Sequence, residues 1–417
     1  MELIWDISNN CNLKCKYCAA TSIDQIKNCH IDYNAVLNNI EGIVDEVSLM
    51  GGEPLLVNGI TNVLSLLTQK KIKINIITNG QVNPQVLDAF IKKGILLQNI
   101  TVSIDGLLED NDFYRGKGSS LKAIEFIKRL LELNRRYSFC KTIGTSIVLH
   151  KNNYNTVVDF VDYLFNKIGI DQVVINPVMI GENCDEEIKA SPQNELDSLI
   201  NIAKYAVKNN IEKRVNITIP TPLVAEYINL EAGSHYNIKP KGCNALSKTI
   251  YCDPYGNVGA CRYSDKPLNV SFSELSPNDQ AFDDFKKKRK MISSKNCDCI
   301  YKDICNSCAF AKGNTLGKNP LCKEIERRYD ISNNKMMHKF VLSSPSKLNF
   351  NENEYMVFFP EENIKQTLTR EGYDIYKAIE NSSKTAFEIG EYSGVIYTAN
   401  PDVETADSGK TETDIPA

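Results

Sequence analysis

The first half of the chain predicts an α/β fold, a partial (β/α)6 TIM-like barrel. Six short runs rich in apolar and β-branched residues alternate with amphipathic stretches up to about residue 210, where the alternation stops. Successive strand-helix units imply parallel strands joined by crossover helices. Because six units are fewer than the eight of a closed barrel, we expect an incomplete one.

The expected strands cover residues 2–7, 45–49, 72–78, 99–104, 143–149 and 171–176. In the intervening helices, apolar residues recur every three or four positions, and turn residues mark the boundaries. Asp32 is a candidate N-cap for the helix that follows it, Asn83-Pro84 begins another that Gly94 ends, and Ser191-Pro192 begins a third. The helix boundaries predicted from these turn residues therefore agree with the periodicity of the apolar residues.

The composition points to a globular, cytoplasmic protein. Lys and Arg number 48 against 52 Asp and Glu, so no strong field favours a nucleic acid or a membrane surface as partner. Glu2 and Asp6 do not suit a secretory signal, and no apolar run approaches the roughly 20 residues of a membrane span. In a reducing compartment, clustered members of the 14 cysteines indicate metal binding rather than disulfides.

The first cysteine cluster directly follows the first expected strand. Cys11, Cys15 and Cys18 are spaced C-x3-C-x2-C. A [4Fe-4S] cluster held by three thiolates keeps one iron open to a small chelating molecule. By themselves the three cysteines could also be part of a zinc site, whose usual spacing is a repeated C-x2-C.

Three further motifs stand at the ends of the next strands. Gly51-Gly52-Glu53-Pro54 follows the second strand, Thr78-Asn79-Gly80 ends the third, and Ser103-Ile104-Asp105-Gly106 ends the fourth. Each alone is ordinary turn chemistry. Because barrels of this kind carry their chemistry at the carboxyl ends of the strands, their recurrence there favours one shared site.

The cysteine triplet together with Gly51 to Pro54 resembles the radical S-adenosylmethionine (SAM) superfamily. The resemblance implies that the open iron binds SAM and that reductive cleavage yields a 5′-deoxyadenosyl radical, which abstracts hydrogen from a substrate. It places Gly51 to Pro54 at the methionyl amino group, with Glu53 also able to reach ribose hydroxyls. The implied SAM-binding residues are Tyr17, Gly51, Gly52, Glu53, Pro54, Asn79, Ser103, Asp105 and Arg115.

Residues 211–325 hold eight more cysteines, and their spacing resembles a SPASM domain with two auxiliary [4Fe-4S] clusters. That resemblance assigns one cluster to Cys243, Cys252, Cys261 and Cys308, and the other to Cys297, Cys299, Cys305 and Cys322. The run Cys297, Cys299, Cys305 and Cys308 departs from the usual C-x2-C-x5-C-x3-C spacing, so the individual assignments stay open. Two structural zinc sites are the alternative. A hairpin turn is expected over residues 251–258 and would bring Cys252 and Cys261 together.

The remainder of the chain divides into an extension, residues 326–397, and a polar, acidic tail, residues 398–417, expected to be flexible. Residues 354–359 predict a strand, and Thr369 can cap a helix through about Glu380. This part faintly resembles winged-helix modules that bind leader peptides. A packing appendage is the alternative. Cys29, Cys140 and Cys184 are expected to be packed thiols.

With residues 1–210 as the radical SAM barrel and 211–325 as the SPASM domain, the resemblance implies an enzyme that modifies a ribosomally made precursor peptide or protein. The modification would be a crosslink such as a thioether, or another oxidation. A low-potential donor such as flavodoxin or ferredoxin would supply the electron. No catalytic base is evident.

Two alternatives remain. One is a sulfatase-maturase-like enzyme that forms formylglycine. Such enzymes usually place an aspartate base after the cysteine that here is Cys261, whereas this chain has Arg262, which leaves Asp253 or Asp265 as the candidate base. The other alternative is a non-catalytic iron-sulfur or leader-peptide-binding protein.

Overall fold

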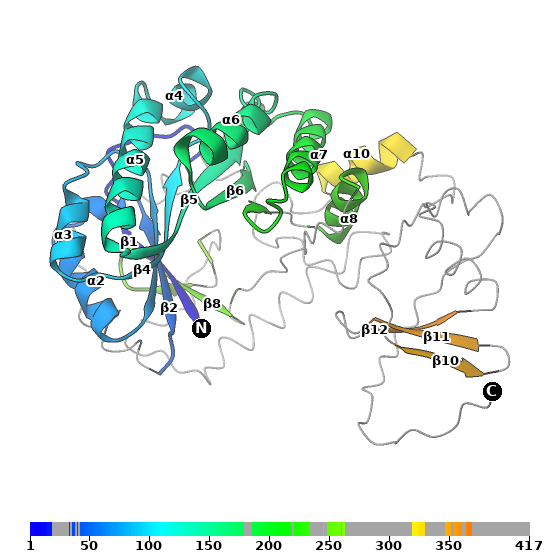
Figure 1. Cartoon of the computed structure of the whole chain (residues 1–417), viewed down its shortest axis with the longest axis horizontal. Coiled ribbons are helices and arrows are strands. Elements are labelled where there is room, and N and C mark those ends of the chain that lie inside the picture. The colour runs from blue at the N-terminus through cyan, green and yellow to red at the C-terminus, as the bar shows by residue number, and fades with distance from the viewer. Residues whose placement is uncertain are drawn as a thin grey trace. The chain divides into compact units, whose positions relative to one another are not determined.

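The computed structural model of the chain (Figure 1) describes residues 1–18, 33, 36–37, 40, 42–178, 186–218, 221–233, 245, 248–259, 261–262, 319–329, 347–351, 354–359 and 364–368. The chain divides into two compact units, Met1–Arg328 and Tyr329–Ala417.

The first unit is organised around a nine-stranded sheet in the order β7-β6-β5-β4-β3-β2-β1-β8-β9. Its first six strands pair in parallel and lie within a few residues of the predicted ones, so the α/β barrel-type fold is confirmed. These strands are β1 (Glu2–Ser8), β2 (Glu46–Gly51), β3 (Lys73–Thr78), β4 (Leu97–Ser103), β5 (Cys140–Leu149) and β6 (Gln172–Pro177).

Three short strands beyond residue 210 join the same sheet, which the periodicity did not predict. β7 (Val215–Ile217) pairs in parallel with β6, and β8 (Thr249–Cys252) pairs in parallel with β1. β9 (Val258–Gly259) pairs antiparallel with β8 and completes the expected hairpin. The second cysteine region is therefore attached directly to the strand that leads into the first.

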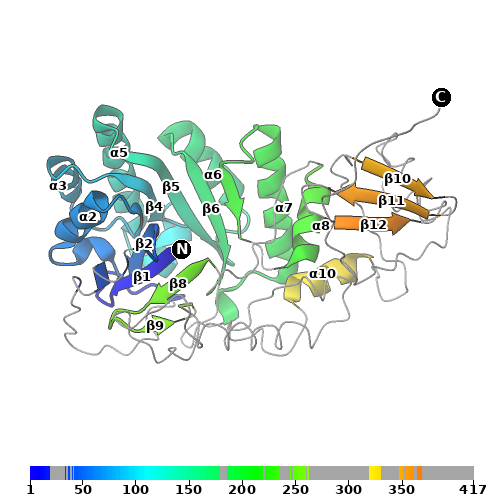
Figure 2. The same ribbon diagram turned by 90° about the horizontal axis from the view of Figure 1, so that it is seen from below.

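Helices connect the strands and lie mainly on one side of the sheet, as α2, α3, α5 and α6 do in Figure 2. Ser191 caps α7 as expected, because its Oγ accepts a hydrogen bond of 3.2 Å from the N–H of Asn194. The helices described are α2 (Ile60–Gln69), α3 (Val86–Lys92), α4 (Glu109–Arg115), α5 (Ser119–Tyr137), α6 (Val157–Tyr163), α7 (Pro192–Lys208), α8 (Pro222–Glu231) and α10 (Pro320–Tyr329), with short turns η2 (Pro54–Leu56), η3 (Leu164–Ile168) and η4 (Glu186–Ile188).

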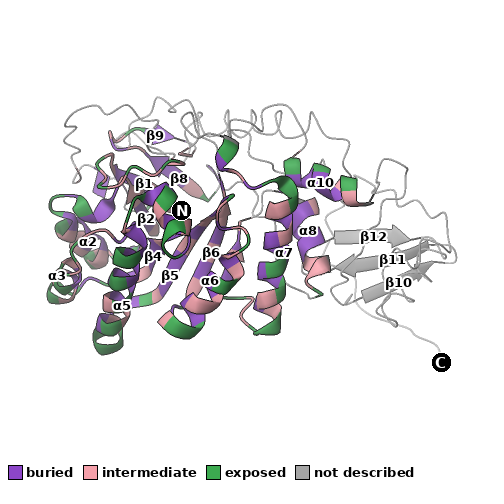
Figure 3. Cartoon of the chain, turned by 90° about the horizontal axis from the view of Figure 1, so that it is seen from above, coloured by how far each residue is buried: buried purple, intermediate pink, exposed green. Residues whose placement is uncertain are grey.

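The two faces of the sheet differ in polarity because successive side chains of a strand point to opposite faces. One face packs under the helices and is apolar. Val102 of β4, for example, lies with Phe126 of α5 around Gly80. The opposite face carries hydrogen-bonded polar side chains, such as Asn75 with Ser48. Figure 3 shows how strongly the strands are buried. The polar face is the inner face expected of a partial barrel.

The second unit contains a three-stranded antiparallel sheet in the order β10-β11-β12. Its strands are β10 (Lys347–Asn351), β11 (Glu354–Phe359) and β12 (Ile364–Leu368), so the strand predicted at residues 354–359 is present as the central one. The helix expected from Thr369 to Glu380 and the tail from residue 398 lie outside the described residues. Within the part of the chain that the structure describes, no helix is long and apolar enough to cross a membrane.

Candidate active site

The cysteine loop begins three residues after β1. Its three thiols are half-buried and are not joined by disulfides. The N–H of Leu13 and the Nδ2 amide of Asn79 approach Cys11 Sγ at 3.4 and 3.5 Å. Burial raises the pKa of the Cys15 thiol to about 12, so a thiolate here needs a cationic partner such as iron. Donors aimed at a cysteine sulfur suit a thiolate that ligates an iron-sulfur cluster.

Among the residues that the structure describes, no three His, Cys, Asp or Glu side chains form a group that could hold a metal ion. Three thiolates can each bind a different iron of a [4Fe-4S] cluster, which leaves the fourth iron open to another ligand.

The glycines of Gly51-Gly52-Glu53-Pro54 permit close contact with the chain that leads into the cysteine loop. The N–H of Gly52 donates to the carbonyl of Ser8 at 2.6 Å, and that of Glu53 to the carbonyl of Asn10 at 2.8 Å. A Cβ at Gly52 would lie only 2.2 Å from the Asn10 carbonyl oxygen, and one at Gly51 only 2.4 Å from that of Ser8. The end of β2 therefore holds the backbone just before Cys11, and only glycine leaves room for it.

The Glu53 side chain joins the ends of β2 and β3. Its carboxylate is fully buried, with Oε1 accepting from Thr78 Oγ1 at 2.7 Å and from the N–H of Leu55 at 3.0 Å. Oε2 accepts from the N–H of Asn79 at 2.7 Å. Burial raises the pKa of this carboxyl group and the hydrogen bonds oppose the rise. From the sequence, the Glu53 carboxylate was expected to bind the amino group or ribose hydroxyls of SAM. In the structure both oxygens accept from protein donors and so fix Asn79 beside Cys11.

Asp105 and Arg115, both suggested by the sequence, bind each other. Arg115 Nε and Nη2 donate to the two carboxylate oxygens at 2.8 and 2.9 Å, and both side chains are buried. Burial opposes ionisation of Asp105, yet the guanidinium keeps its pKa below the ordinary value. The hydroxyl of Tyr17 also donates to Asp105, and the N–H of Val148 donates to it at 2.9 Å. The pair therefore anchors the cysteine loop to the ends of β4 and β5.

His150 belongs to the same cluster, and the sequence analysis did not single it out. Its side chain is fully buried, with the ring 4.3 Å from that of Tyr114 and 6.2 Å from that of Tyr17. Nδ1 accepts from the N–H of Asn152 at 3.2 Å, and Nε2 lies 4.0 Å from Asp105. Burial lowers its pKa, which favours the neutral ring. Its position just after β5, at the carboxyl edge of the sheet, was the clue available in the sequence.

Ser103 ends β4 in register with Ser146 of β5, on the polar face of the sheet. The chain of hydrogen bonds continues across this face, because Asn176 donates to Ser146 Oγ at 2.9 Å and Thr218 donates to Asn176 at 2.9 Å. Ser103 is thus placed at the rim of a polar surface that spans β4 to β7.

The hairpin of the second cysteine region contacts the first site directly. Arg262 Nε donates to Asp6 Oδ2 at 2.9 Å, and its Nη2 donates to the carbonyl of Gly51 at 3.0 Å. The hydroxyl of Tyr251 donates to Asp6 at 2.8 Å, and Asn9 donates to the hydroxyl of Tyr255 at 2.9 Å. Asp6 and Arg262 were not predicted to meet, because 256 residues separate them.

Of the eight cysteines of the second region, three are described. Cys252 is buried on β8, Cys261 is half-buried after β9, and Cys322 is buried on α10, 3.4 Å from Thr221 Oγ1. The remaining five lie outside the described residues, so the grouping into two sites stays a prediction: Cys243, Cys297, Cys299, Cys305 and Cys308.

The sequence also predicted candidate catalytic bases in this region and three packed thiols elsewhere in the chain. Asp253, a candidate base of a maturase-like enzyme, caps the hairpin turn by accepting from the N–H groups of Tyr255 and Asn257 at 2.8 and 2.9 Å. Asp265 lies outside the described residues, as do Cys29 and Cys184. Cys140 is buried on β5 and its thiol donates to the carbonyl of Thr142 at 3.2 Å, as a packed thiol would.

Residues 5–164 match the family model of the Radical SAM superfamily. This part of the chain is therefore a radical SAM domain, as the cysteine triplet and Gly51 to Pro54 suggested. Such a domain implies SAM and a [4Fe-4S] cluster as cofactors.

Individual relatives resemble this chain at low sequence identity and over only part of its length. The radical SAM cyclopropyl synthase TigE from Paramaledivibacter caminithermalis is 25% identical over 287 residues, 62% of this chain and 56% of the relative. An S-adenosylmethionine-dependent nucleotide dehydratase from Lacinutrix mariniflava is 29% identical over 156 residues, 34% of this chain. The chain spans only 32% of that dehydratase, so the reaction of a whole relative does not transfer directly.

Solved structures extend the likeness in fold beyond the matched domain. The structure of anSMEcpe with bound AdoMet and Cp18Cys peptide covers 80% of this chain and 99% of its own, with a TM-score of 0.58 and 17% identity. Streptococcus suis SuiB bound to S-adenosylmethionine covers 77% of each chain, with a TM-score of 0.60 and 18% identity. At these identities the likeness establishes the fold alone.

Proposed function

We propose that the chain cleaves SAM reductively and uses the 5′-deoxyadenosyl radical to oxidise a ribosomally made peptide, installing a crosslink or a related modification. The observation that carries the proposal is the hydrogen-bonded unit at the carboxyl edge of the sheet. In that unit Gly52 and Glu53 fix the backbone before Cys11, and Glu53 also fixes Asn79 against the Cys11 sulfur. This unit holds the three-cysteine loop against the ends of the next two strands, where the sequence places the predicted SAM-binding residues.

In this proposal Cys11, Cys15 and Cys18 hold a [4Fe-4S] cluster, which when bound supplies the electron that splits SAM. The chain's own residues do the positioning. Asp105 and Arg115 hold Tyr17, and through it the cysteine loop, against the sheet. The predicted SAM-binding set stays a proposal. Within it Ser103 lies at the rim of the polar face, whereas the Glu53 carboxylate and the Asp105–Arg115 pair are engaged within the protein. Burial of this cluster of side chains limits the water available to quench a radical.

A peptide is the favoured substrate for two reasons. The inner face of the sheet carries amide and hydroxyl groups, among them Asn176, Ser146 and Thr218, which can hydrogen-bond a peptide backbone. In the second unit, β10 and β12 are the edge strands of an antiparallel sheet, and strand addition at such an edge is a common way to bind a peptide. The peptides in the anSMEcpe structure, and in a structure of SuiB with the precursor SuiA, agree with this choice.

We also propose two auxiliary [4Fe-4S] clusters in the second cysteine region, which would accept the electron that a substrate radical must lose. Reconstituted protein should then contain about twelve iron atoms, four for each of three clusters. Cys305→Ala should lower this by about four while SAM cleavage continues. An unchanged iron content, or zinc in place of iron, would contradict auxiliary clusters.

The maturase-like alternative is disfavoured because the position after Cys261 carries Arg262, whose guanidinium is bound to Asp6 and Gly51. Asp253 is engaged in the hairpin turn. A non-catalytic iron-sulfur or leader-peptide-binding protein remains the alternative of another class, and it predicts no turnover of SAM.

The deciding experiment measures 5′-deoxyadenosine released by anaerobically reconstituted protein with SAM and dithionite. Wild type should release it, and Cys15→Ala should not, because two thiolates do not retain the cluster. Cys140→Ala, which removes a packed thiol outside the loop, is the matched control and should retain activity. The same assay with short peptides encoded beside the gene should increase the yield and change the mass of the true substrate.

A further inference from the structure

We propose that Cys252, which the spacing of the cysteines assigned to an auxiliary cluster, is a packed thiol of the sheet core and ligates no iron. The cluster assigned to Cys243, Cys252, Cys261 and Cys308 is then held by at most three of these four thiolates. The inference rests on the proposed function in one respect, since it concerns which cysteines serve the auxiliary clusters proposed there. Nothing in the comparisons assigns a role to Cys252.

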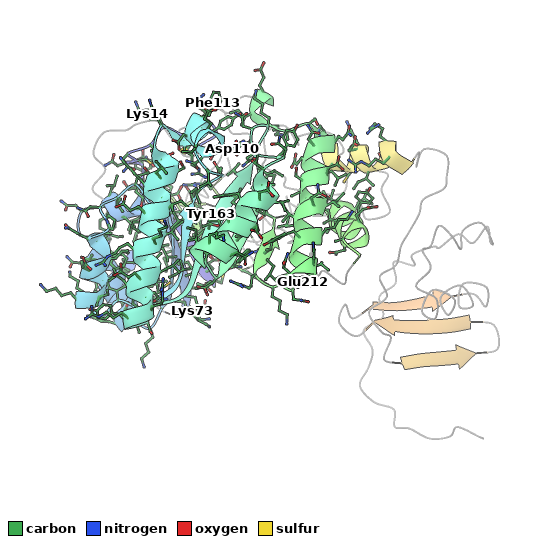
Figure 4. All side chains as sticks on the ribbon, turned by 45° about the horizontal axis from the view of Figure 1, so that its top comes forward. Lys14, Lys73, Asp110, Phe113, Tyr163 and Glu212 are labelled. Atoms are coloured by element: carbon green, nitrogen blue, oxygen red, sulfur yellow. The ribbon has the colours of Figure 1, made fainter. Side chains whose placement is uncertain are left out.

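The position of Cys252 along its strand is compatible with a cluster ligand. It is the last residue of β8, which runs parallel to β1 and therefore ends toward the edge of the sheet that carries the first cysteine loop. Figure 4 shows that edge by the labels of Lys14 and Phe113, while Lys73, the first residue of β3, lies at the opposite edge. What excludes Cys252 is the direction of its side chain.

The pairing of the strands fixes the face of the sheet on which Cys252 lies. Residues paired directly across neighbouring strands point to the same face, and successive residues of one strand point to opposite faces. Cys252 pairs with Trp5 of β1 on one side and with Val258 of β9 on the other. Trp5 in turn pairs with Leu49 of β2 and so belongs to the apolar face that packs under the helices. The Cys252 side chain therefore points into this apolar face.

The neighbouring Tyr251 points the other way, and the chain at Cys261 lies on its side of the hairpin. The Tyr251 hydroxyl donates at 2.8 Å to Asp6 on the polar face. A Cβ at Gly259 would lie 2.9 Å from Tyr251 Cδ1 and 3.8 Å from the carbonyl oxygen of Cys261, so the backbone at Cys261 borders the polar face. The hairpin forms as the sequence predicted, but it does not present Cys252 and the chain at Cys261 to a common space.

The surroundings of Cys252 are apolar and closely packed. Cys252 is fully buried, and so are Trp5, Ile250 and Val258, which share its face of the sheet. The ring of Tyr33 lies 6.0 Å from that of Trp5 and adds to the same layer. The three thiols of the first cysteine loop are only half-buried. A thiol enclosed by packed apolar side chains has no room for a four-iron cluster beside it.

The polar contact of the Cys252 sulfur is that of a thiol. Its Sγ donates to the carbonyl of Asp253 at 3.5 Å. The packed thiol of Cys140 donates to the carbonyl of Thr142 in the same way. The Cys11 sulfur instead accepts from a backbone N–H and from a side-chain amide. Because hydrogen-bond donors stabilise a ligating thiolate and a carbonyl oxygen repels it, the contact at Cys252 does not suit an iron ligand.

The iron content of the reconstituted protein tests the inference. We expect Cys252→Ala and Cys252→Val to retain the wild-type content of about twelve iron atoms, whereas Cys305→Ala should lose about four. Two variants are used because alanine leaves a small cavity and valine adds a methyl group, so a folding defect of one does not decide the result. Cys140→Ala, at another packed thiol, is the matched control and should lose no iron. A loss of about four iron atoms in both Cys252 variants would overturn the inference.

Spectroscopy separates an unaltered cluster from one that keeps its iron after losing a ligand. In a Cys15→Ala background, which removes the first cluster, only the auxiliary clusters contribute to the electron paramagnetic resonance spectrum of the reduced protein. We expect Cys252→Val to leave that spectrum unchanged. A changed spectrum would count against the inference, because replacing a thiolate ligand alters the surroundings of one iron.

Alkylation separates this inference from the proposed function. If wild type binds only about four iron atoms, the proposed auxiliary clusters are wrong, and the packing of Cys252 is then decided by its reactivity in the folded chain. With iodoacetamide, followed by mass spectrometry of peptides, we expect the half-buried Cys261 to react at least about tenfold faster than Cys252. Equal rates at the two cysteines would show that Cys252 is not enclosed in the core.

Discussion

Arg262 and Asp6 form an ion pair that links the two cysteine regions of the chain. Arg262 directly follows Cys261, and Asp6 lies five residues before Cys11, with 2.9 Å between Nε and Oδ2. Because Arg262 also donates to the carbonyl of Gly51, one side chain contacts β1 and the end of β2. The second region therefore directly contacts the motif that holds the first.

Removal of this guanidinium should destabilise the first unit. Asp6 is fully buried, so Arg262→Ala leaves a buried carboxylate without its cation, which costs about 3 kcal/mol. Urea unfolding of the reconstituted protein measures the change. Arg129→Ala, which breaks the exposed pair with Asp88, is the control and should cost less than about 1 kcal/mol. Equal losses in the two variants would show that the Arg262 pair is no stronger than a surface pair.

Gly52→Ala should impair cluster binding through the backbone alone. The added Cβ would lie 2.2 Å from the carbonyl oxygen of Asn10, so the chain before Cys11 must move. We expect the iron content to fall by about four atoms per chain and SAM cleavage to be lost. Gly94→Ala is the control, since its Cβ meets nothing within 4 Å and the strain of its positive φ costs only about 1 kcal/mol. A Gly52→Ala protein with full iron content would refute the steric argument.

Asp105→Asn should strongly destabilise the folded chain, although it hardly changes the size of the side chain. The substitution keeps the shape of the side chain but leaves Arg115 buried without a counter-charge, at a cost of about 3 kcal/mol. The thermal unfolding midpoint should fall by several degrees, and the Tyr17 contact should loosen. Asp88→Asn, at a half-exposed carboxylate, serves as the comparison and should shift the midpoint little. Similar midpoints for the two variants would argue against a buried pair at Asp105.

Glu195 should make stability depend on pH. Burial raises its pKa to about 7 in the folded chain, above the ordinary value of 4.5, while Lys189 opposes the rise. The unfolded chain therefore releases this proton at lower pH than the folded chain does, and the stabilisation present below about pH 4.5 is lost as the pH rises towards 7. Glu195→Gln should leave the unfolding midpoint unchanged near pH 4.5 and raise it by a few degrees at pH 8. Glu125→Gln, at an exposed position, should raise it at neither pH.

The six principal strands could be predicted because their signals are local. β-branched runs such as Ile74 to Ile77 specify a strand without reference to the rest of the chain. β8 and β9 are four and two residues long. They form because β8 pairs with β1 and the hairpin turn lets β9 pair with β8. No window of sequence that short carries a periodicity, so these strands depend on tertiary pairing.

By itself the sequence determined the cysteine spacing, the glycine pair at the end of β2 and the order of motifs along the sheet, because each is a property of neighbouring residues. Only the tertiary structure decided the partners of the buried charged groups. Glu53 bonds to Thr78 and Asn79, Asp105 to Arg115, and Asp6 to Arg262. A buried charge takes whichever partner the packed strands bring within hydrogen-bond reach, and that proximity does not exist until the sheet has formed.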